Sequence, residues 1–190
     1  MKVLATQTKS ERTQAAILAA AEALFAKNGY ERTTLRDIAA LARIDPAMII
    51  RYFDSKDALF ARVATFDLML PDLRTVERSA IGTTLVRHFL RVWEGERGNS
   101  GLAILLRSAA SNEHAAKKLR ELFKSQVMPA LKYAGADAYA AERAGLVASQ
   151  LLGLALCRYV LKLPPAVTMS REFIVAEVGK TIQRYVAGDE

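Results

Sequence analysis

The chain has 190 residues, of which 52% are hydrophobic and 25% charged, with ten Gly, five Pro and one Cys. This apolar content excludes a largely disordered chain, and so few Gly and Pro exclude collagen-like or low-complexity sequence. The single Cys157 excludes an intramolecular disulfide framework and a thiolate cluster, and we expect it to be a small core residue rather than a sensor thiol. These features predict a reducing compartment, by default the cytoplasm.

The formal net charge of +7 makes a polyanionic partner plausible, although a basic excess also serves solubility. Residues 1–56 carry nine Lys or Arg and six Asp or Glu, so the excess is not concentrated there. A nucleic-acid partner must therefore be inferred from where the basic residues lie and not from their number. The longest nearly uncharged stretch, Ala144 to Cys157, is shorter than the roughly 18 to 20 residues that a bilayer-spanning helix needs. The polar residues 1–10 lack the pattern of a secretory signal, and we expect no membrane partner.

Apolar residues recur at helical spacing almost throughout, which predicts an all-α protein. The first helix should begin near Ser10 or Glu11 and end at Asn28. Gly29 is then a left-handed residue after the helix, and Tyr30 folds back on the apolar stripe as the hydrophobic contact of that cap.

Two short helices follow. Thr34 to Asp37 has the form of a capping box, which opens a helix that ends near Ala42. Asp45 and Pro46 supply an N-cap carboxylate and a proline at the first helical position of the next helix. We expect Ile49 and Phe53 on its buried side, and a fourth helix over residues 57–70 as the sole covalent bridge to the rest of the chain.

After Pro71 the pattern of apolar residues predicts longer amphipathic helices, near residues 81–93, 102–110, 113–132, 139–160 and 171–186. Pro129 should kink or divide the third of these, and Pro164 and Pro165 should separate the last two, because proline cannot donate into a helical ladder.

The two short helices, residues 35–42 and 46–53, have the dimensions of a helix-turn-helix. A helix fits the major groove of DNA only when another helix braces it from behind. Ile38, Ala39 and Ala42 would form that brace against Ile44, Ile49 and Phe53. The pattern therefore predicts duplex DNA as a partner.

Several motifs resemble the N-terminal domain of TetR-family transcriptional regulators: Leu24-Phe25, Gly29-Tyr30, Thr33-Thr34, Ile38-Ala39 and the run from Ala42 to Leu59. The resemblance covers about a quarter of the chain. It implies a helix-turn-helix domain, residues 1–56, joined to a larger helical domain, residues 57–190, that binds a small-molecule effector and forms a homodimer. Such regulators are mostly repressors that bind a palindromic operator and are released by ligand.

The resemblance assigns DNA contact to Thr34, Arg36, Pro46, Ala47, Met48, Arg51, Tyr52 and Lys56. Arg36 suits a phosphate or the edge of guanine, and residues 46–48 suit apolar contacts such as thymine methyl groups. Tyr52 and Lys56 match positions that hold phosphates, which fix register without reading sequence.

The chain departs from the family pattern at three positions. Arg43 and Ala47 stand where Gly is frequent, and Ile50 replaces a Tyr that usually touches the DNA backbone. A left-handed Arg43 would cost about 1 to 2 kcal/mol, so a different turn geometry is an alternative. Arg51, the next residue, is available to touch the DNA backbone in place of that Tyr.

In the larger domain, the resemblance places an effector pocket among the middle helices, with candidate lining residues Phe89, Trp93, Leu105, Phe123, Val127 and Met128. The alternative is that each of these is an ordinary residue of the hydrophobic core. The apolar excess in the last two major helices suits a dimer interface, with candidates Leu151, Leu154, Ile174, Val178, Ile182 and Tyr185, or a wholly intramolecular core.

The chain lacks a nucleophile elbow, a Walker sequence and a pair of His at metal-ligand spacing, so we expect no enzyme, metal or cofactor. Two alternatives to a regulator stay open. One is a ligand-binding or scaffold protein that retains an inactive DNA-binding module. The other is a small all-α enzyme acting through His88 or His114, which are otherwise structural histidines.

Overall fold

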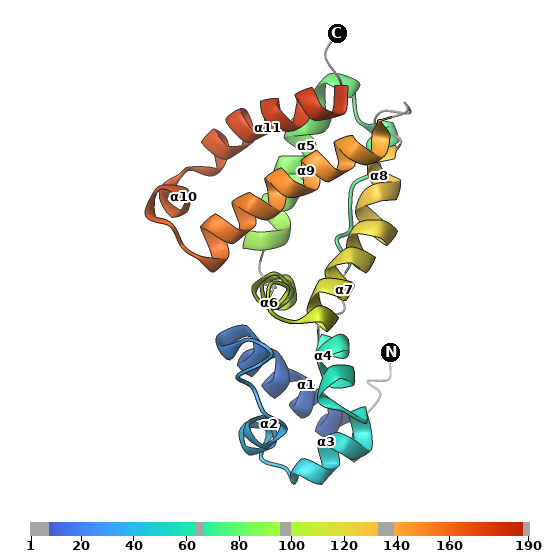
Figure 1. The fold of residues 1–190 in the computed structure, drawn as a ribbon, viewed down its shortest axis with the longest axis vertical. Coiled ribbons are helices and arrows are strands. Elements are labelled where there is room, and N and C mark those ends of the chain that lie inside the picture. The colour runs from blue at the N-terminus through green and yellow to red at the C-terminus, as the bar shows by residue number, and fades with distance from the viewer. Residues whose placement is uncertain (1–7, 64–66, 96–99, 133–138, 188–190) are drawn as a thin grey trace, which may run out of the picture. The chain divides into compact units, whose positions relative to one another are not determined.

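The computed structural model describes residues 8–63, 67–95, 100–132 and 139–187 (Figure 1), and these residues form helices and no strand. The chain divides into two units, residues 1–65 with 100–116 and residues 66–99 with 117–190. The predicted all-α fold is confirmed.

The N-terminal unit begins with four helices, and each starts or ends close to its predicted residue. They are α1 (Lys9–Asn28), α2 (Leu35–Ala42), α3 (Pro46–Phe53) and α4 (Lys56–Val63). The prediction missed the capping box that Thr8 and Glu11 form at the start of α1. It also made the fourth helix too long, because α4 ends at Val63 and residues 67–70 are not helical.

The core of this unit is built on α1, and its large buried side chains include Ile17, Phe25, Ile38, Ile49, Leu59 and Phe60. Gly29 has φ 77° and ψ 175°, a backbone region that glycine alone adopts readily. Because the chain turns there, the Tyr30 ring stacks on Phe25 at 6.0 Å and meets Phe60 edge-on at 5.0 Å. The predicted return of Tyr30 onto the apolar stripe is confirmed.

Helix α6 (Ser100–Ser108) and the first turn of α7 (Glu113–Leu122) also belong to the N-terminal unit. Arg107 donates to the carbonyl oxygen of Ala26 near the end of α1, at 2.7 Å. His114 Nδ1 lies 3.4 Å from the Asp57 carboxylate at the start of α4. The chain therefore passes between the units three times, so α4 is not their sole covalent bridge and the units do not divide between residues 56 and 57.

The C-terminal unit is built on three long helices, α5 (Ile81–Glu94), α9 (Ala140–Ala155) and α11 (Arg171–Ala187), which pack together. Shorter segments complete it: the 3₁₀ turns η1 (Leu73–Thr75) and η2 (Arg78–Ala80), the rest of α7, the π-helical η3 (Phe123–Val127), α8 (Met128–Lys132), the π-helical η4 (Leu156–Val160) and α10 (Pro164–Thr168). Pro129 is the second residue of α8, two residues after the end of η3, and the predicted disturbance of the long helix takes the form of this π-helical turn.

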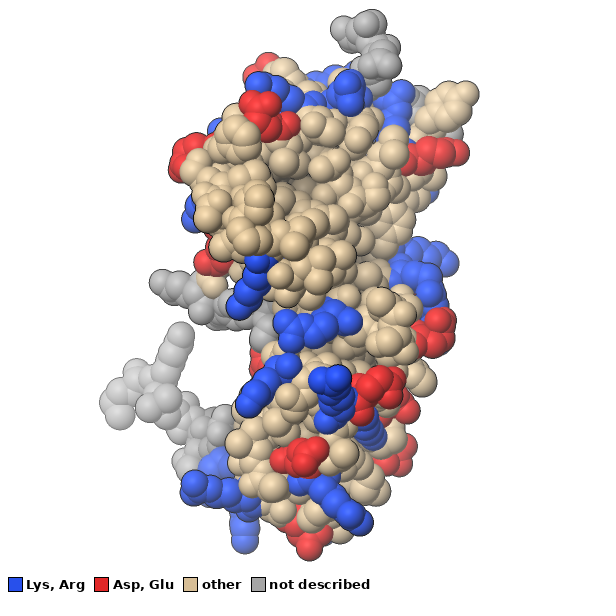
Figure 2. All heavy atoms as spheres, turned by 60° about the vertical axis from the view of Figure 1, so that its left-hand side comes forward, with Lys and Arg blue, Asp and Glu red and all other residues tan. Residues whose placement is uncertain are grey.

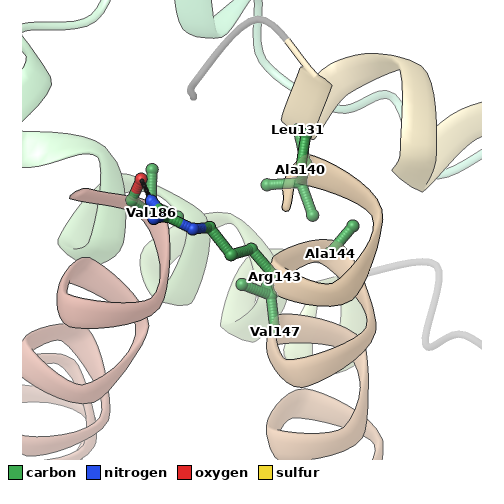
Figure 3. A pocket seen from close by; sticks show the side chains of 6 residues that line it. All are labelled: Leu131, Ala140, Arg143, Ala144, Val147 and Val186. Carbon is green, nitrogen blue, oxygen red and sulfur yellow. Dashed lines mark hydrogen bonds between the residues drawn. The ribbon is translucent and has the colours of Figure 1, made fainter. Parts of the chain in front are cut away.

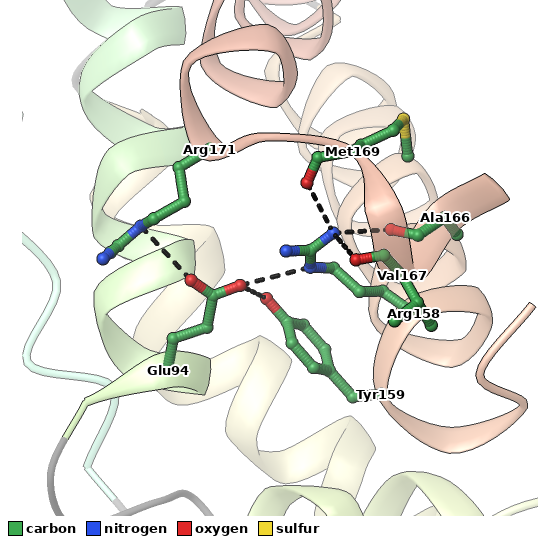
Figure 4. A network of polar contacts seen from close by, with 7 residues as sticks. All are labelled: Glu94, Arg158, Tyr159, Ala166, Val167, Met169 and Arg171. Carbon is green, nitrogen blue, oxygen red and sulfur yellow. Dashed lines mark hydrogen bonds and ion pairs between the residues drawn. The ribbon is translucent and has the colours of Figure 1, made fainter. Parts of the chain in front are cut away.

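Pro164 and Pro165 separate the last two long helices, as predicted, but they do so by starting the short helix α10. Arg158 satisfies the end of this helix, because its guanidinium donates to the carbonyl oxygens of Ala166, Val167 and Met169 (Figure 4). The same guanidinium reaches the Glu94 carboxylate at 3.1 Å, which ties α10 to the end of α5.

One continuous helix, Ala140–Val160, is formed by α9 and η4, and it is longer than the uncharged stretch within it because it includes Arg143 and Arg158. Its 21 residues have a mean hydropathy of 1.2. By length and composition alone this helix could cross a bilayer, although core helices of soluble proteins pass the same test. The sequence analysis considered only the uncharged residues 144–157 and therefore underestimated the length of the helix.

Candidate nucleic-acid interface

Thr34 starts α2 by a complete capping box. Its hydroxyl accepts from the Asp37 N–H at 3.1 Å, and the Asp37 carboxylate accepts from both the hydroxyl and the N–H of Thr34. These hydrogen bonds lower the pKa of the Asp37 carboxyl. A phosphate oxygen needs a donor, and both donors of Thr34 are already used by Asp37. The structure thus gives Thr34 a capping role and leaves Arg36, which is exposed on the same turn, free to face a ligand.

The turn between α2 and α3 places Arg43 in the left-handed region, with φ 56° and ψ 48°. The Arg43 N–H donates to Ala40 at 3.2 Å and the Ile44 N–H donates to Ala39 at 3.0 Å, which closes the end of α2 as glycine would. Arg43 therefore adopts the turn that glycine usually makes, at a cost of about 1 to 2 kcal/mol.

Helix α3 has two different sides. Asp45 caps it by accepting from the Ala47 N–H at 2.7 Å, and Ile49 and Phe53 are buried against the rest of the unit. The other side is formed by exposed or half-buried residues: Pro46, Ala47, Met48, Ile50, Arg51 and Tyr52. The predicted division of α3 into a buried and an outward side is confirmed.

The junction of α3 and α4 is a tight γ-turn. Asp54 has φ 71° and ψ −49°, and the Ser55 N–H donates to the Phe53 carbonyl oxygen at 2.8 Å. The Ser55 hydroxyl then accepts from the Ala58 N–H at 3.0 Å, which starts α4. This turn fixes Lys56 at the first residue of α4.

Lys56 lies over an aromatic ring that sequence analysis did not connect with it. Its Nζ is 4.1 Å from the centre of the Tyr30 ring, and the Tyr30 hydroxyl donates to the Asp57 carboxylate. Burial and the Asp57 carboxylate raise the pKa of the Tyr30 phenol above its usual range, so the hydroxyl stays protonated. The ring attracts the ammonium group through its negative face and holds it at the surface. The Gly-Tyr pair at residues 29 and 30 is the sequence signal for this support.

The candidate effector residues fall into both units. Phe89 and Trp93 on α5 are buried, whereas Phe123, Val127 and Met128 on η3 and α8 are half-buried, and all five are in the C-terminal unit. Leu105, on α6, is buried in the N-terminal unit. The six residues therefore do not form one group within a unit. Trp93 instead stacks on Tyr159 at 4.8 Å, which the sequence did not indicate.

Neither of two hollows in the described part of the C-terminal unit is lined by a candidate effector residue. A cavity of about 10 Å³, room for one water molecule, is lined by Leu131, Ala140, Arg143, Ala144, Val147 and Val186 (Figure 3). An open groove of about 350 Å³ is lined by Thr83, Arg87, Leu90, Arg171, Glu172, Val175 and Ala176.

The candidate dimer residues need correction. Ile174 and Ile182 are 0% exposed and Leu154 is 9% exposed, because these side chains face the core of their own unit. A buried side chain cannot contact a second chain, so the prediction is wrong for these three residues. Leu151, Val178 and Tyr185 are half-buried.

A different set of apolar side chains is exposed on α9, α10 and α11 and the segments that join them: Leu146, Leu156, Leu161, Leu163, Val167 and Phe173. Figure 2 shows a broad surface of the C-terminal unit that carries few charged residues on this side. An exposed apolar surface of this kind marks an interaction site more often than a free surface.

Comparison with known proteins gives a match in both units. Residues 17–63 match the family model of bacterial regulatory proteins of the tetR family. Residues 80–186 match the model of the tetracyclin repressor-like C-terminal domain. An HTH-type transcriptional repressor of Mycobacterium tuberculosis is 43% identical over 56 residues, and this chain spans only 30% of its length.

Solved structures match nearly the whole chain. A TetR-family regulator from Streptomyces coelicolor is 27% identical, with a TM-score of 0.65 over 95% of this chain and 98% of that one. NalD of Pseudomonas aeruginosa, described as the secondary repressor of the MexAB-OprM multidrug efflux pump, has a TM-score of 0.71 at 18% identity, over 96% of this chain and 100% of its own. Because one family model alone covers more than half of the residues, the chain belongs to the TetR family of bacterial transcriptional regulators.

Proposed function

We propose that this protein is a repressor that binds a palindromic operator as a homodimer in the cytoplasm and is released by a small-molecule effector. The observation that carries the proposal is the division of α3, which buries Ile49 and Phe53 and leaves its N-terminal turn and outer side exposed. A braced helix of this form fits the major groove, and a dimer presents two of them about one DNA turn, ~34 Å, apart.

The exposed residues suggest how the operator is read. Pro46, Ala47 and Met48 offer no side-chain hydrogen bond, so they favour apolar contacts, for which the methyl group of thymine is the available partner. The guanidinium groups of Arg36 and Arg51 suit guanine or phosphate, and Lys56 suits a phosphate. The Asp37 carboxylate accepts from Thr34 in the capping box of α2 and the Asp45 carboxylate caps α3, which reduces their repulsion of DNA.

We place the dimer contact on the exposed side of α9 together with Phe173 on α11. Gly145, Ser149 and Gly153 are spaced four residues apart on this side, and a Cβ atom built on either glycine would meet no atom within 4 Å. Leu146 and Leu156 flank them. A second copy of the same helix can therefore approach closely and bury the apolar side chains of both chains.

Binding to DNA is tested with an operator selected from random duplexes and then titrated by fluorescence anisotropy at several salt concentrations. We expect Arg36→Ala and Lys56→Met to weaken binding about tenfold, and Lys56→Met to lower the salt slope by about one. Arg184→Ala, which removes an exposed arginine of α11 in the C-terminal unit, is the matched control and should bind like the original protein. A protein that prefers no selected duplex over random DNA contradicts the proposal and favours a scaffold with an inactive DNA-binding module.

The dimer is tested by sedimentation. Gly153→Trp adds a large side chain to open surface, so it should leave the fold intact and yield monomers, whereas Gly153→Ala should remain a dimer. If Gly145→Trp and Gly153→Trp both leave a dimer of unchanged mass, this face is not the interface.

A further inference from the structure

Leu68 is held by side chains at both of its backbone polar groups. Its carbonyl oxygen lies 2.7 Å from His88 Nε2 on α5, and its N–H donates to Gln126 Oε1 on η3 at 2.7 Å. The next residue, Met69, is left-handed with φ 47°, and its N–H donates to the Asp67 carboxylate at 2.9 Å. These residues follow α4 in the chain and form no regular element, so their position is set by side chains of the C-terminal unit.

The chemistry of His88 makes its contact directional. A carbonyl oxygen only accepts, so Nε2 must carry the proton toward Leu68. Nδ1 lies 3.3 Å from the Arg91 guanidinium, which only donates, so Nδ1 must be the acceptor. Both contacts select the same neutral tautomer. Burial, with the nearby Arg91 charge, lowers the pKa of the His88 imidazole and favours this neutral form.

A loop usually satisfies its backbone with water, because connecting segments run over the surface. Here the C-terminal unit instead provides a histidine that is 8% exposed and a half-buried glutamine from a different element. A shift of α5 against η3 would therefore alter the two hydrogen bonds to Leu68.

We propose that His88 and Gln126 form a backbone clamp that fixes where the chain leaves the C-terminal unit toward α4 and so limits the range of positions that the two units take. The effect on operator binding rests on the proposed function. His88 and Gln126 act here as positioning residues.

The test compares isosteric pairs. Gln126→Met removes the acceptor for the Leu68 N–H, and Gln126→Glu retains one. His88→Leu removes the donor to the Leu68 carbonyl, and His88→Gln retains one. Hydrogen exchange reports the clamp itself, and we expect the Leu68 amide to exchange about tenfold faster in Gln126→Met, with the original rate in Gln126→Glu.

The consequence for the units is measured by pulsed electron spin resonance. Spin labels are placed at Arg32→Cys and Arg184→Cys, one in each unit, with Cys157→Ser, and the labelled protein is diluted into unlabelled protein. We expect a broader distance distribution in Gln126→Met than in Gln126→Glu, and weaker binding to the selected operator. The same contrast is expected between His88→Leu and His88→Gln, and if His88→Leu does not fold, the Gln126 pair alone decides.

A distance distribution that is unchanged in Gln126→Met, although Leu68 exchanges faster, would overturn the proposal. Failure of the proposed function gives a different result, because the original protein would then bind no operator while the label distances of the variants would still differ.

Discussion

The carbonyl oxygen of Gly179 on α11 lies 2.3 Å from the position that a Cβ atom would occupy at Gly82 on α5. The two helices therefore cross at a distance that only glycine permits at residue 82. Gln183 completes the crossing, because its side chain accepts from the Gly82 N–H and donates to the Arg78 carbonyl oxygen, each at 2.8 Å. The packing of α5 on α11 thus depends on the lack of a side chain at Gly82 and on the side-chain amide of Gln183.

Gly82→Ala should destabilise the protein by about 3 kcal/mol or more, because the atoms nearest the new methyl group are backbone atoms that cannot move alone. Gly145→Ala on α9 is the matched control. Within one chain its Cβ meets open space, and we expect the proposed dimer to tolerate one methyl group here, as at Gly153, so helix propensity should raise the free energy of unfolding by about 0.5 to 1 kcal/mol. Urea unfolding measures both, and equal stability of the two variants would refute the close crossing.

Arg43→Gly should raise the free energy of unfolding by about 1 kcal/mol, because glycine adopts the left-handed conformation at φ 56° without the penalty of a side chain. The gain is reduced by the entropy that glycine adds to the unfolded chain. Thermal unfolding measures the change. Arg43→Ala, which keeps the penalty, should show no gain, and a gain of equal size there would point to relief of charge repulsion instead.

Arg158 and Arg171 both contact the Glu94 carboxylate but differ in burial, with side chains 12% and 51% exposed (Figure 4). Arg158→Met should cost about 2 to 3 kcal/mol, because it also leaves three carbonyl oxygens at the end of α10 without their donor. Arg171→Met should cost less than about 1 kcal/mol, since an exposed ion pair is screened by water. Chemical denaturation of both variants checks the difference, and similar losses would contradict this assignment.

The lowered pKa of the His88 imidazole predicts a loss of stability in mild acid. Below its usual pKa of 6.5 the unfolded chain binds a proton more readily than the folded chain does, so stability falls as the pH drops from 6.5 toward the folded pKa. His88→Gln keeps a donor for Leu68 and does not titrate. Its stability should therefore depend less on pH over this range, and identical pH profiles would show that His88 carries no shifted pKa.

Ser108 has a buried hydroxyl oxygen that finds no hydrogen-bond partner among the residues that the structure describes. Ser108→Ala removes that unsatisfied group and adds helix propensity, so we expect the free energy of unfolding to rise by about 1 to 2 kcal/mol. Ser111→Ala, at an exposed position three residues on, is the comparison variant and should change stability by less than about 0.5 kcal/mol. Destabilisation by Ser108→Ala would mean that the hydroxyl has a partner in solution.

The sequence by itself determined helices α1, α2 and α3 of the N-terminal unit almost to the residue. Thr34, Asp45 and Gly29 act through their own backbone or that of residues up to four positions away, so their patterns can be read without knowing the fold. The spacing of Ile49 and Phe53 likewise fixes which side of α3 is buried, because a helix of eight residues has one inward side.

Only the tertiary structure decided the contacts between segments distant in the chain. The periodicity of α11 shows that Ile174 and Ile182 share a face, but not whether that face meets α5 or a second copy, and the structure places it inside. The support of Lys56 by Tyr30 and the hold of His88 on Leu68 join residues 26 and 20 positions apart. Such pairs depend on how helices cross, and an apolar or polar pattern along one helix carries no information about the partner that it will meet.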